Sequence, residues 1–98
     1  MHMVETLLGV GQASSEFLIV GNCDILVENL TSGSVKLQYK LPPSTLKAVP
    51  AWTDFPGGLF TTAIYKTVFI SEHGVIMRVL GVGNNANVYV RLSRYLNK

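Results

Sequence analysis

Short apolar runs separated by turn-forming residues set the pattern of this chain. Each run is rich in β-branched and aromatic residues, and each ends at a cluster containing glycine, proline or asparagine. No segment between the runs shows the period of 3.6 residues that indicates an amphipathic helix. Short strands separated by turn residues are typical of an all-β sandwich. The predicted strands are residues 4–10, 17–30, 34–41, 49–55, 59–70, 74–80 and 86–93.

The last of these runs alternates most cleanly between apolar and polar residues. Successive side chains of a strand point to opposite faces, so one half of the set is expected to face the core. The residues predicted to be buried are Ala86, Val88, Val90 and Leu92. Those predicted to face outward are Asn87, Tyr89, Arg91 and Ser93.

Clusters rich in glycine, proline and asparagine predict where the strands end or bend. Gly21-Asn22 interrupts the second run, either as a turn between two strands or as a bulge inside one strand. Pro56-Gly57-Gly58 and Glu72-His73-Gly74 are predicted to form tight turns. Residues 81–85 are rich in glycine and asparagine, which suit positive φ angles, so they are expected to form a further turn.

A length of 98 residues predicts one domain over residues 1–98, and seven or eight strands in this order suggest two packed antiparallel sheets. The predicted fold class is all-β, a single antiparallel β-sandwich of the jelly-roll or immunoglobulin-like kind. Residues 1–3 are expected to be disordered. A His-Met pair after the first methionine resembles a cloning scar, which would place the native start at Met3, but a native Met1-His2 stays open.

Composition changes this picture in one respect, the shortage of charge. Hydrophobic residues make up 48% of the chain and charged residues 14%, against about 25% in typical soluble domains. Either the surface is polar and uncharged, or a partner covers part of it. The second explanation is favoured because obligate interfaces resemble a protein core. The net charge of +2 is small, and no apolar run could span a bilayer, so we expect neither nucleic acid nor membrane as a partner.

Residues suited to catalysis or metal binding are few and scattered. Cys23 is the single cysteine and is predicted to be a small buried hydrophobic residue. Glu72 and His73 could form an acid–base pair, but an exposed turn is the preferred interpretation. The glycines at 81–83 lead into a strand, whereas a phosphate-binding loop precedes a helix. We therefore predict no enzymatic activity, no metal site and no cofactor.

A binding surface is the remaining candidate for function. Tyrosine and arginine are favoured in interface hot spots, which draws attention to the outward-facing Tyr89 and Arg91. Trp52, the only tryptophan, could stack on a sugar or a base, although a lone tryptophan in a small sandwich is more often part of the core. The predicted interface residues are Tyr89, Arg91, Arg94, Tyr65 and Trp52.

Four segments between Leu30 and Ser93 occur in a characteristic order. They are residues 30–38 with Gly33-Ser34-Val35-Lys36-Leu37, residues 52–54 beginning at Trp52, residues 74–79 beginning with Gly74-Val75, and residues 87–93 ending in Leu92-Ser93. This order resembles that of small β-sandwich proteins among the virion structural proteins of tailed bacteriophages. Met77 stands where the pattern usually has an aromatic residue.

The resemblance implies a non-enzymatic structural role in a virion, with capsid decoration as the first choice: a cement protein that binds the shell and stabilises it. The implied partners are the major capsid protein or other virion proteins, together with further copies of the chain in a dimer or trimer. The implied location is the virion, after synthesis in the bacterial cytoplasm. The main alternative is a tail-fibre or adhesin-type module that binds a receptor or carbohydrate through Trp52, Tyr65 or Tyr89. A small enzyme or an enzyme inhibitor is a third alternative.

Overall fold

The computed structural model describes residues 2–41 and 51–94, and their regular structure consists of β-strands. The strands form one antiparallel sheet of six strands in the order β1-β6-β2-β5-β3-β4. They are β1 (His2–Leu8), β2 (Phe17–Glu28), β3 (Ser34–Lys40), β4 (Thr53–Phe60), β5 (Ile64–Val82) and β6 (Val88–Arg94). The predicted class, a single antiparallel β-sandwich, is confirmed.

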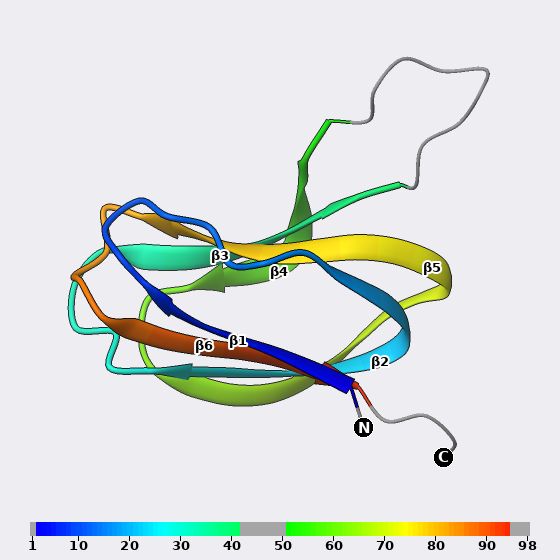
Figure 1. Cartoon of the computed structure of the whole chain (residues 1–98), viewed down its shortest axis with the longest axis horizontal. Coiled ribbons are helices and arrows are strands. Elements are labelled where there is room, and N and C mark those ends of the chain that lie inside the picture. Colours follow the sequence, from blue (N-terminus) through cyan, green and yellow to red (C-terminus); the bar gives the residue numbers. More distant parts are fainter. Residues whose placement is uncertain (1, 42–50, 95–98) are drawn as a thin grey trace.

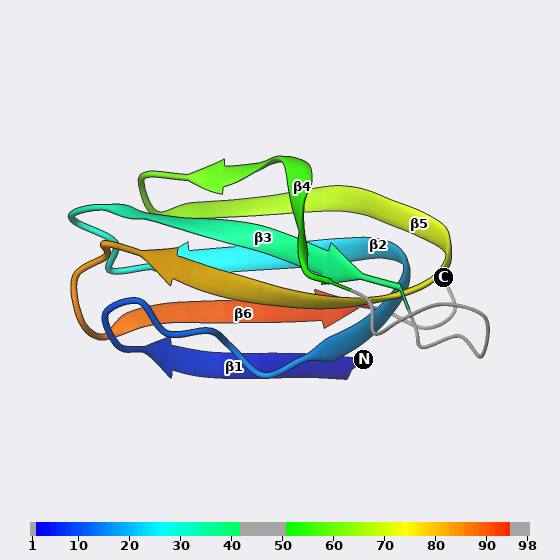
Figure 2. The same cartoon turned by 90° about the horizontal axis from the view of Figure 1, so that it is seen from above.

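The long strands β2 and β5 fold this sheet into two layers (Figures 1 and 2). Residues 22–27 of β2 pair with residues 64–69 of β5, whereas residues 17–19 pair with residues 75–77. Between these two stretches the ribbon curves around one end of the molecule (Figure 1). We call β1, β6, the second part of β2 and the first part of β5 the first layer. The second part of β5 forms the second layer with the first part of β2, β3 and β4.

The bend is made at Gly21, where the register between β2 and β5 shifts on both sides. Gly21 has a φ of 84°, a conformation that glycine adopts readily. Of the two interpretations of Gly21-Asn22, a bulge inside one strand is therefore confirmed. The predicted turn at residues 72–74 is wrong, because β5 runs without interruption from Ile64 to Val82. Pairing with β2 on both sides of the bulge keeps this part of β5 extended.

A second bulge lies in the edge strand β4. The register between β3 and β4 shifts between Lys36 and Gln38, and residues 55–58 of β4 bulge out there. Pro56 has no N–H to give to the ladder, and Gly57 has a φ of 75°. The predicted tight turn is therefore a bulge within a strand, as at Gly21. Because both bulges lie inside strands, the strands are longer than predicted. The described part therefore has six strands and an isolated bridge at Ala13, whereas the sequence predicts seven or eight strands.

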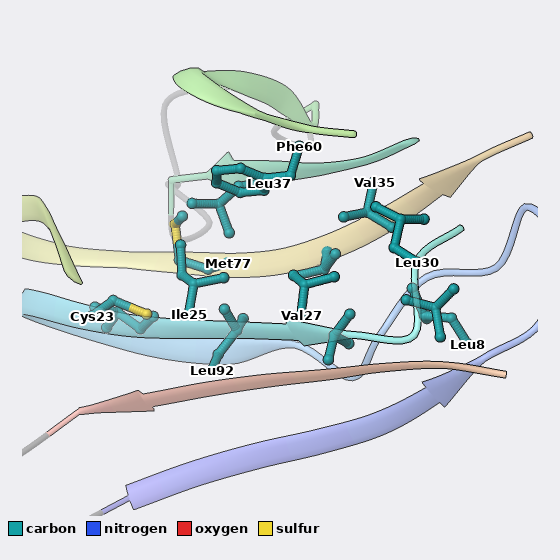
Figure 3. Close-up of a cluster of buried hydrophobic side chains, with 14 of the residues drawn as sticks. Leu8, Cys23, Ile25, Val27, Leu30, Val35, Leu37, Phe60, Met77 and Leu92 are labelled. Carbon is teal, nitrogen blue, oxygen red and sulfur yellow. The ribbon is translucent and has the colours of Figure 1, made fainter. Parts of the chain in front are cut away.

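The hydrophobic core lies between the two layers (Figure 3). The expected burial of Val88, Val90 and Leu92 is confirmed, and each is at most 1% exposed. Ala86 contradicts the alternation. It is exposed because the positive φ of Asn87, 64°, interrupts the strand geometry before β6. Ser93 lies opposite Met3 on the outward side as expected, but it is only 2% exposed because this small side chain lies on a central strand between larger neighbours.

The connections that follow β1, β2 and β5 meet at the end of the sandwich opposite the bend (Figure 1). Asn84 and Asn85 tie them together. Asn84 is 2% exposed; its Oδ1 accepts from the N–H of Gly11 at 2.9 Å, and its amide donates to the carbonyl of Gly9. The Oδ1 of Asn85 accepts from the N–H groups of residues 31–32. Side-chain amides thus satisfy backbone groups that the ladder leaves unpaired.

The ends of the described chain need separate mention. His2 and Met3 pair with Arg94 and Ser93 as the start of β1, so the expected disorder is wrong for these two residues. Backbone pairing with β6 holds His2 and Met3 in the sheet. Met1 and the predicted strand residues 49–50 lie outside the described residues. Within residues 2–41 and 51–94, no helix is long and apolar enough to cross a membrane.

Candidate interaction surface

The outer face of the first layer carries apolar and charged side chains in regular rows. Strand register fixes the rows, because directly opposite residues point to the same face. The first row crosses β1, β6, β2 and β5 and consists of Glu5, Arg91, Leu26 and Tyr65. The row next to it crosses β1, β6 and β2 and consists of Leu7, Tyr89 and Glu28.

We call six residues of this face the first-layer patch: Met3, Leu7, Leu26, Tyr65, Tyr89 and Arg91. Leu7 is 62% exposed and Tyr65 is 64% exposed. Several apolar side chains on one face are more informative than a single exposed one. They lie on a continuous hydrogen-bonded layer, so they form part of one ordered surface.

Hydrogen bonding holds the polar part of this patch in place. The hydroxyl of Tyr89 donates to Oε1 of Glu5 at 2.7 Å. This bond to a carboxylate raises the pKa of Tyr89 above its usual value. Arg91 lies directly opposite Glu5 in the register between β1 and β6. The patch therefore combines apolar side chains with the Arg91 guanidinium, and the Glu5 carboxylate lies beside it.

Trp52 lies on the outer face of the second layer, so its preferred assignment to the core is wrong. The guanidinium carbon of Arg78 is 4.3 Å from the ring centroid, and Nζ of Lys40 is 4.8 Å from it. Both distances are within the range of cation–π interactions. The indole is half-buried against its own chain's cations.

Beside Trp52, polar side chains form a chain of contacts across β5, β3 and β4. Arg78 Nε donates to Gln38 Oε1 at 2.9 Å, and Gln38 Nε2 donates to Asp54 Oδ1 at 3.0 Å. Nζ of Lys36 lies 3.3 Å from Asp54 Oδ2. The hydrogen bond from Gln38, followed by that from Lys36, lowers the pKa of Asp54 below its usual value.

Arg94 lies apart from Trp52 and from the residues of the first-layer patch. Its guanidinium lies 5.9 Å from the ring centroid of Phe17, and its Nε is buried without a hydrogen-bond partner. It lines a hollow of about 360 Å³ near the Gly21 bend, together with Asp24, Thr67 and Ser93. The five predicted interface residues are thus distributed over three places, and only Tyr65, Tyr89 and Arg91 come together.

Reactive groups in the described part of the chain are dispersed or inert. Cys23 is fully buried, and burial raises the pKa of its thiol to about 12. The side chains of Glu72 and His73 lie outside what the structure describes. Among the described residues, no group of three or more His, Cys, Asp or Glu side chains could hold a metal ion.

Met3, Leu7 and Leu26 belong to the patch but were not predicted from sequence. Apolar residues occur on both faces of residues 3–8, so the pattern alone does not say which of them is buried. The pairing of β1 with β6 decides this. It places Leu8 opposite Val88 in the core and Leu7 opposite Tyr89 on the outside.

Comparison with known proteins adds no assignment. No protein-family model matches the chain, and neither a curated protein nor a solved structure matches it. The likeness to phage virion proteins therefore stays a prediction made from the order of sequence segments.

Proposed function

We propose that this chain is a non-enzymatic structural protein of a tailed-bacteriophage virion, and that it decorates the capsid. The proposed partner is the major capsid protein or another protein of the shell. Attachment occurs through the first-layer patch. The chain would be made in the bacterial cytoplasm and would end in the virion, without nucleic acid or membrane as a partner.

The exposed apolar side chains of the first-layer patch carry this proposal. Leu7 and Tyr65 would lose most of their accessible surface against a flat partner. Removing apolar surface from water is the main favourable term in most protein association. Tyrosine and arginine at the same site are the residue types that most often form hot spots.

Two further properties suit a structural protein. The connections at one end are tied by Asn84 and Asn85, so the sandwich presents its faces with little freedom to rearrange. Charged residues are only 14% of the chain, so little charge has to be desolvated when a face is covered.

Co-sedimentation with capsids assembled without this chain tests the proposal. Wild-type protein is expected to sediment with these capsids, and the double variant Leu7→Ser/Tyr65→Ser is expected to stay in the supernatant. Leu59→Ser is the matched control, because Leu59 is also 62% exposed but lies on β4, outside the patch. Equal binding by all three proteins would place attachment elsewhere. No binding by the wild type would reject the decoration role.

A binding module for a receptor or carbohydrate is the second candidate, and it rests on Trp52. A half-buried indole on an outer face, next to Lys40 and Arg78, could stack on a sugar that carries an acidic group. Titration with acidic oligosaccharides would then quench the fluorescence of Trp52, and Arg78→Ala would weaken that response. An unchanged spectrum across such a panel would reject this candidate.

A further inference from the structure

Three free edges of the sandwich differ in how they are protected. β4 carries the bulge at residues 55–58 with Pro56. The first part of β5 has Lys66 opposite the fully buried Ile25, which is an inward-pointing charge on an edge. Proline, bulges and inward-pointing lysines all hinder the addition of another strand.

β1 has none of these devices. All seven of its residues pair with β6 in one unbroken register, so the strand is extended throughout. No described strand pairs with its other side, and it forms the border of the sheet in Figure 2. An unprotected extended edge offers unpaired N–H and C=O groups to a further strand.

We propose that β1 pairs antiparallel with β1 of a second copy, about a two-fold axis at Glu5, to form a dimer. The pattern around Glu5 is self-complementary. Met3 and Leu7 are both exposed and apolar, whereas Val4 and Thr6 are both half-buried. Antiparallel pairing about Glu5 places Met3 against Leu7 of the second copy, and Val4 against Thr6.

The charges at the axis are compensated within each copy. Pairing places the two Glu5 carboxylates next to each other, which alone would be unfavourable. Each carboxylate accepts a hydrogen bond from Tyr89, and Arg91 lies opposite it on β6. The row across the dimer reads Arg91, Glu5, Glu5, Arg91, with no net charge.

This inference deepens the proposed decoration role, on which its functional meaning rests, and it names where two copies of the chain meet. Pairing at β1 joins the two first layers into one wider layer and places two first-layer patches on the same side. Two attachment sites on one rigid body strengthen binding to a shell that repeats its own sites. The dimer can be tested on the purified chain alone, so its failure is distinct from a failure to bind capsids.

Cysteine substitution along β1 tests the register. Directly opposite Cα atoms of antiparallel strands lie about 4.5 or 5.5 Å apart, which a disulfide can span. Under oxidised glutathione, Glu5→Cys is expected to form a cross-linked dimer, while Thr62→Cys, in an exposed loop, is expected to stay uncross-linked. Cys23 is buried and does not interfere. Cross-linking of Val4→Cys or Thr6→Cys in place of Glu5→Cys would contradict the axis at Glu5.

The mass in solution tests the edge itself. Light scattering is expected to give a mass of twice 10.7 kDa for the wild type and a mass of 10.7 kDa for Val4→Lys. This substitution places a charge on the inward-facing side of the edge, which hinders strand pairing. Tyr65→Ser is expected to remain dimeric, because Tyr65 lies on the far strand of the same layer. A monomeric or trimeric wild type, or loss of the dimer in Tyr65→Ser, would overturn the proposal.

Discussion

Gly33 lies against Gly83 so closely that a β-carbon on Gly33 would clash with the Gly83 carbonyl group. Gly33 also has a φ of 69°, which side chains rarely adopt. This approach brings the connection between β2 and β3 against the connection between β5 and β6. The two glycines therefore fix how the two layers are joined at the end opposite the bend.

Gly33→Ala is expected to destabilise the fold more than Gly11→Ala. Both positions have a φ near 70°, but nothing lies within 4 Å of the β-carbon position at Gly11. Gly11→Ala should cost about 1 kcal/mol from the backbone conformation alone. Gly33→Ala should cost about 2 kcal/mol more, because backbone has to move. Urea unfolding of the two variants measures the difference, and equal costs would show that the close approach is not rigid.

Asn84→Ala is expected to lower the free energy of unfolding by about 2–3 kcal/mol. The substitution removes a buried amide side chain and leaves the N–H of Gly11 and the carbonyl of Gly9 without their side-chain partner. Asn22→Ala, at an exposed asparagine, should change stability by less than about 0.5 kcal/mol. Thermal or urea unfolding compares them. A small effect at Asn84 would mean that water replaces its hydrogen bonds.

Val90→Asp is expected to unfold the domain, whereas Asn87→Asp is expected to be tolerated. Val90 is 1% exposed, and an unpaired buried carboxylate costs several kcal/mol, comparable to the stability of a whole domain. Asn87 is exposed at a positive φ, which aspartate also adopts. Circular dichroism distinguishes a folded β spectrum from a disordered one. Equal behaviour of the two variants would contradict the facing of β6.

Stability is expected to fall between pH 9 and pH 12 because of Cys23. Burial raises the pKa of the thiol from 9.0 to about 12, so the fold favours the neutral form. This contribution is complete below pH 9 and is lost as the pH rises toward 12, with a slope of at most about 1.4 kcal/mol per pH unit.

Cys23→Ala is the matched comparison for this pH effect, because it keeps every other titrating group, including Tyr89. Its unfolding free energy should be lower than that of the wild type at pH 8, and the two values should approach each other at higher pH. Parallel curves from pH 9 to pH 12 would show that the thiol is not protected in the fold.

The sequence predicted strands well where one face is apolar and the other polar, as in Val88, Val90 and Leu92 of β6. It failed where turn residues lie inside a strand. Glycine and proline at residues 56–58 and 72–74 favour turns locally, but pairing with β3 and β2 holds them in β4 and β5. Tertiary pairing of this kind leaves no local signal in the chain.

The candidate site was predicted in part, for a related reason. Tyr89 and Arg91 follow from alternation in β6, but their neighbours on β1 come from a distant part of the chain. Trp52 was misplaced because its cationic partners, Lys40 and Arg78, lie on other strands. Residue type alone does not reveal such partners.

Quantitative mass spectrometry of purified virions tests the central claim, that this sandwich is a repeated component of a phage shell. A decorated capsid repeats each attachment site by symmetry, so on the order of hundreds of copies per particle are expected. Absence from the particle, or only a few copies per particle as in a fibre, would contradict the account.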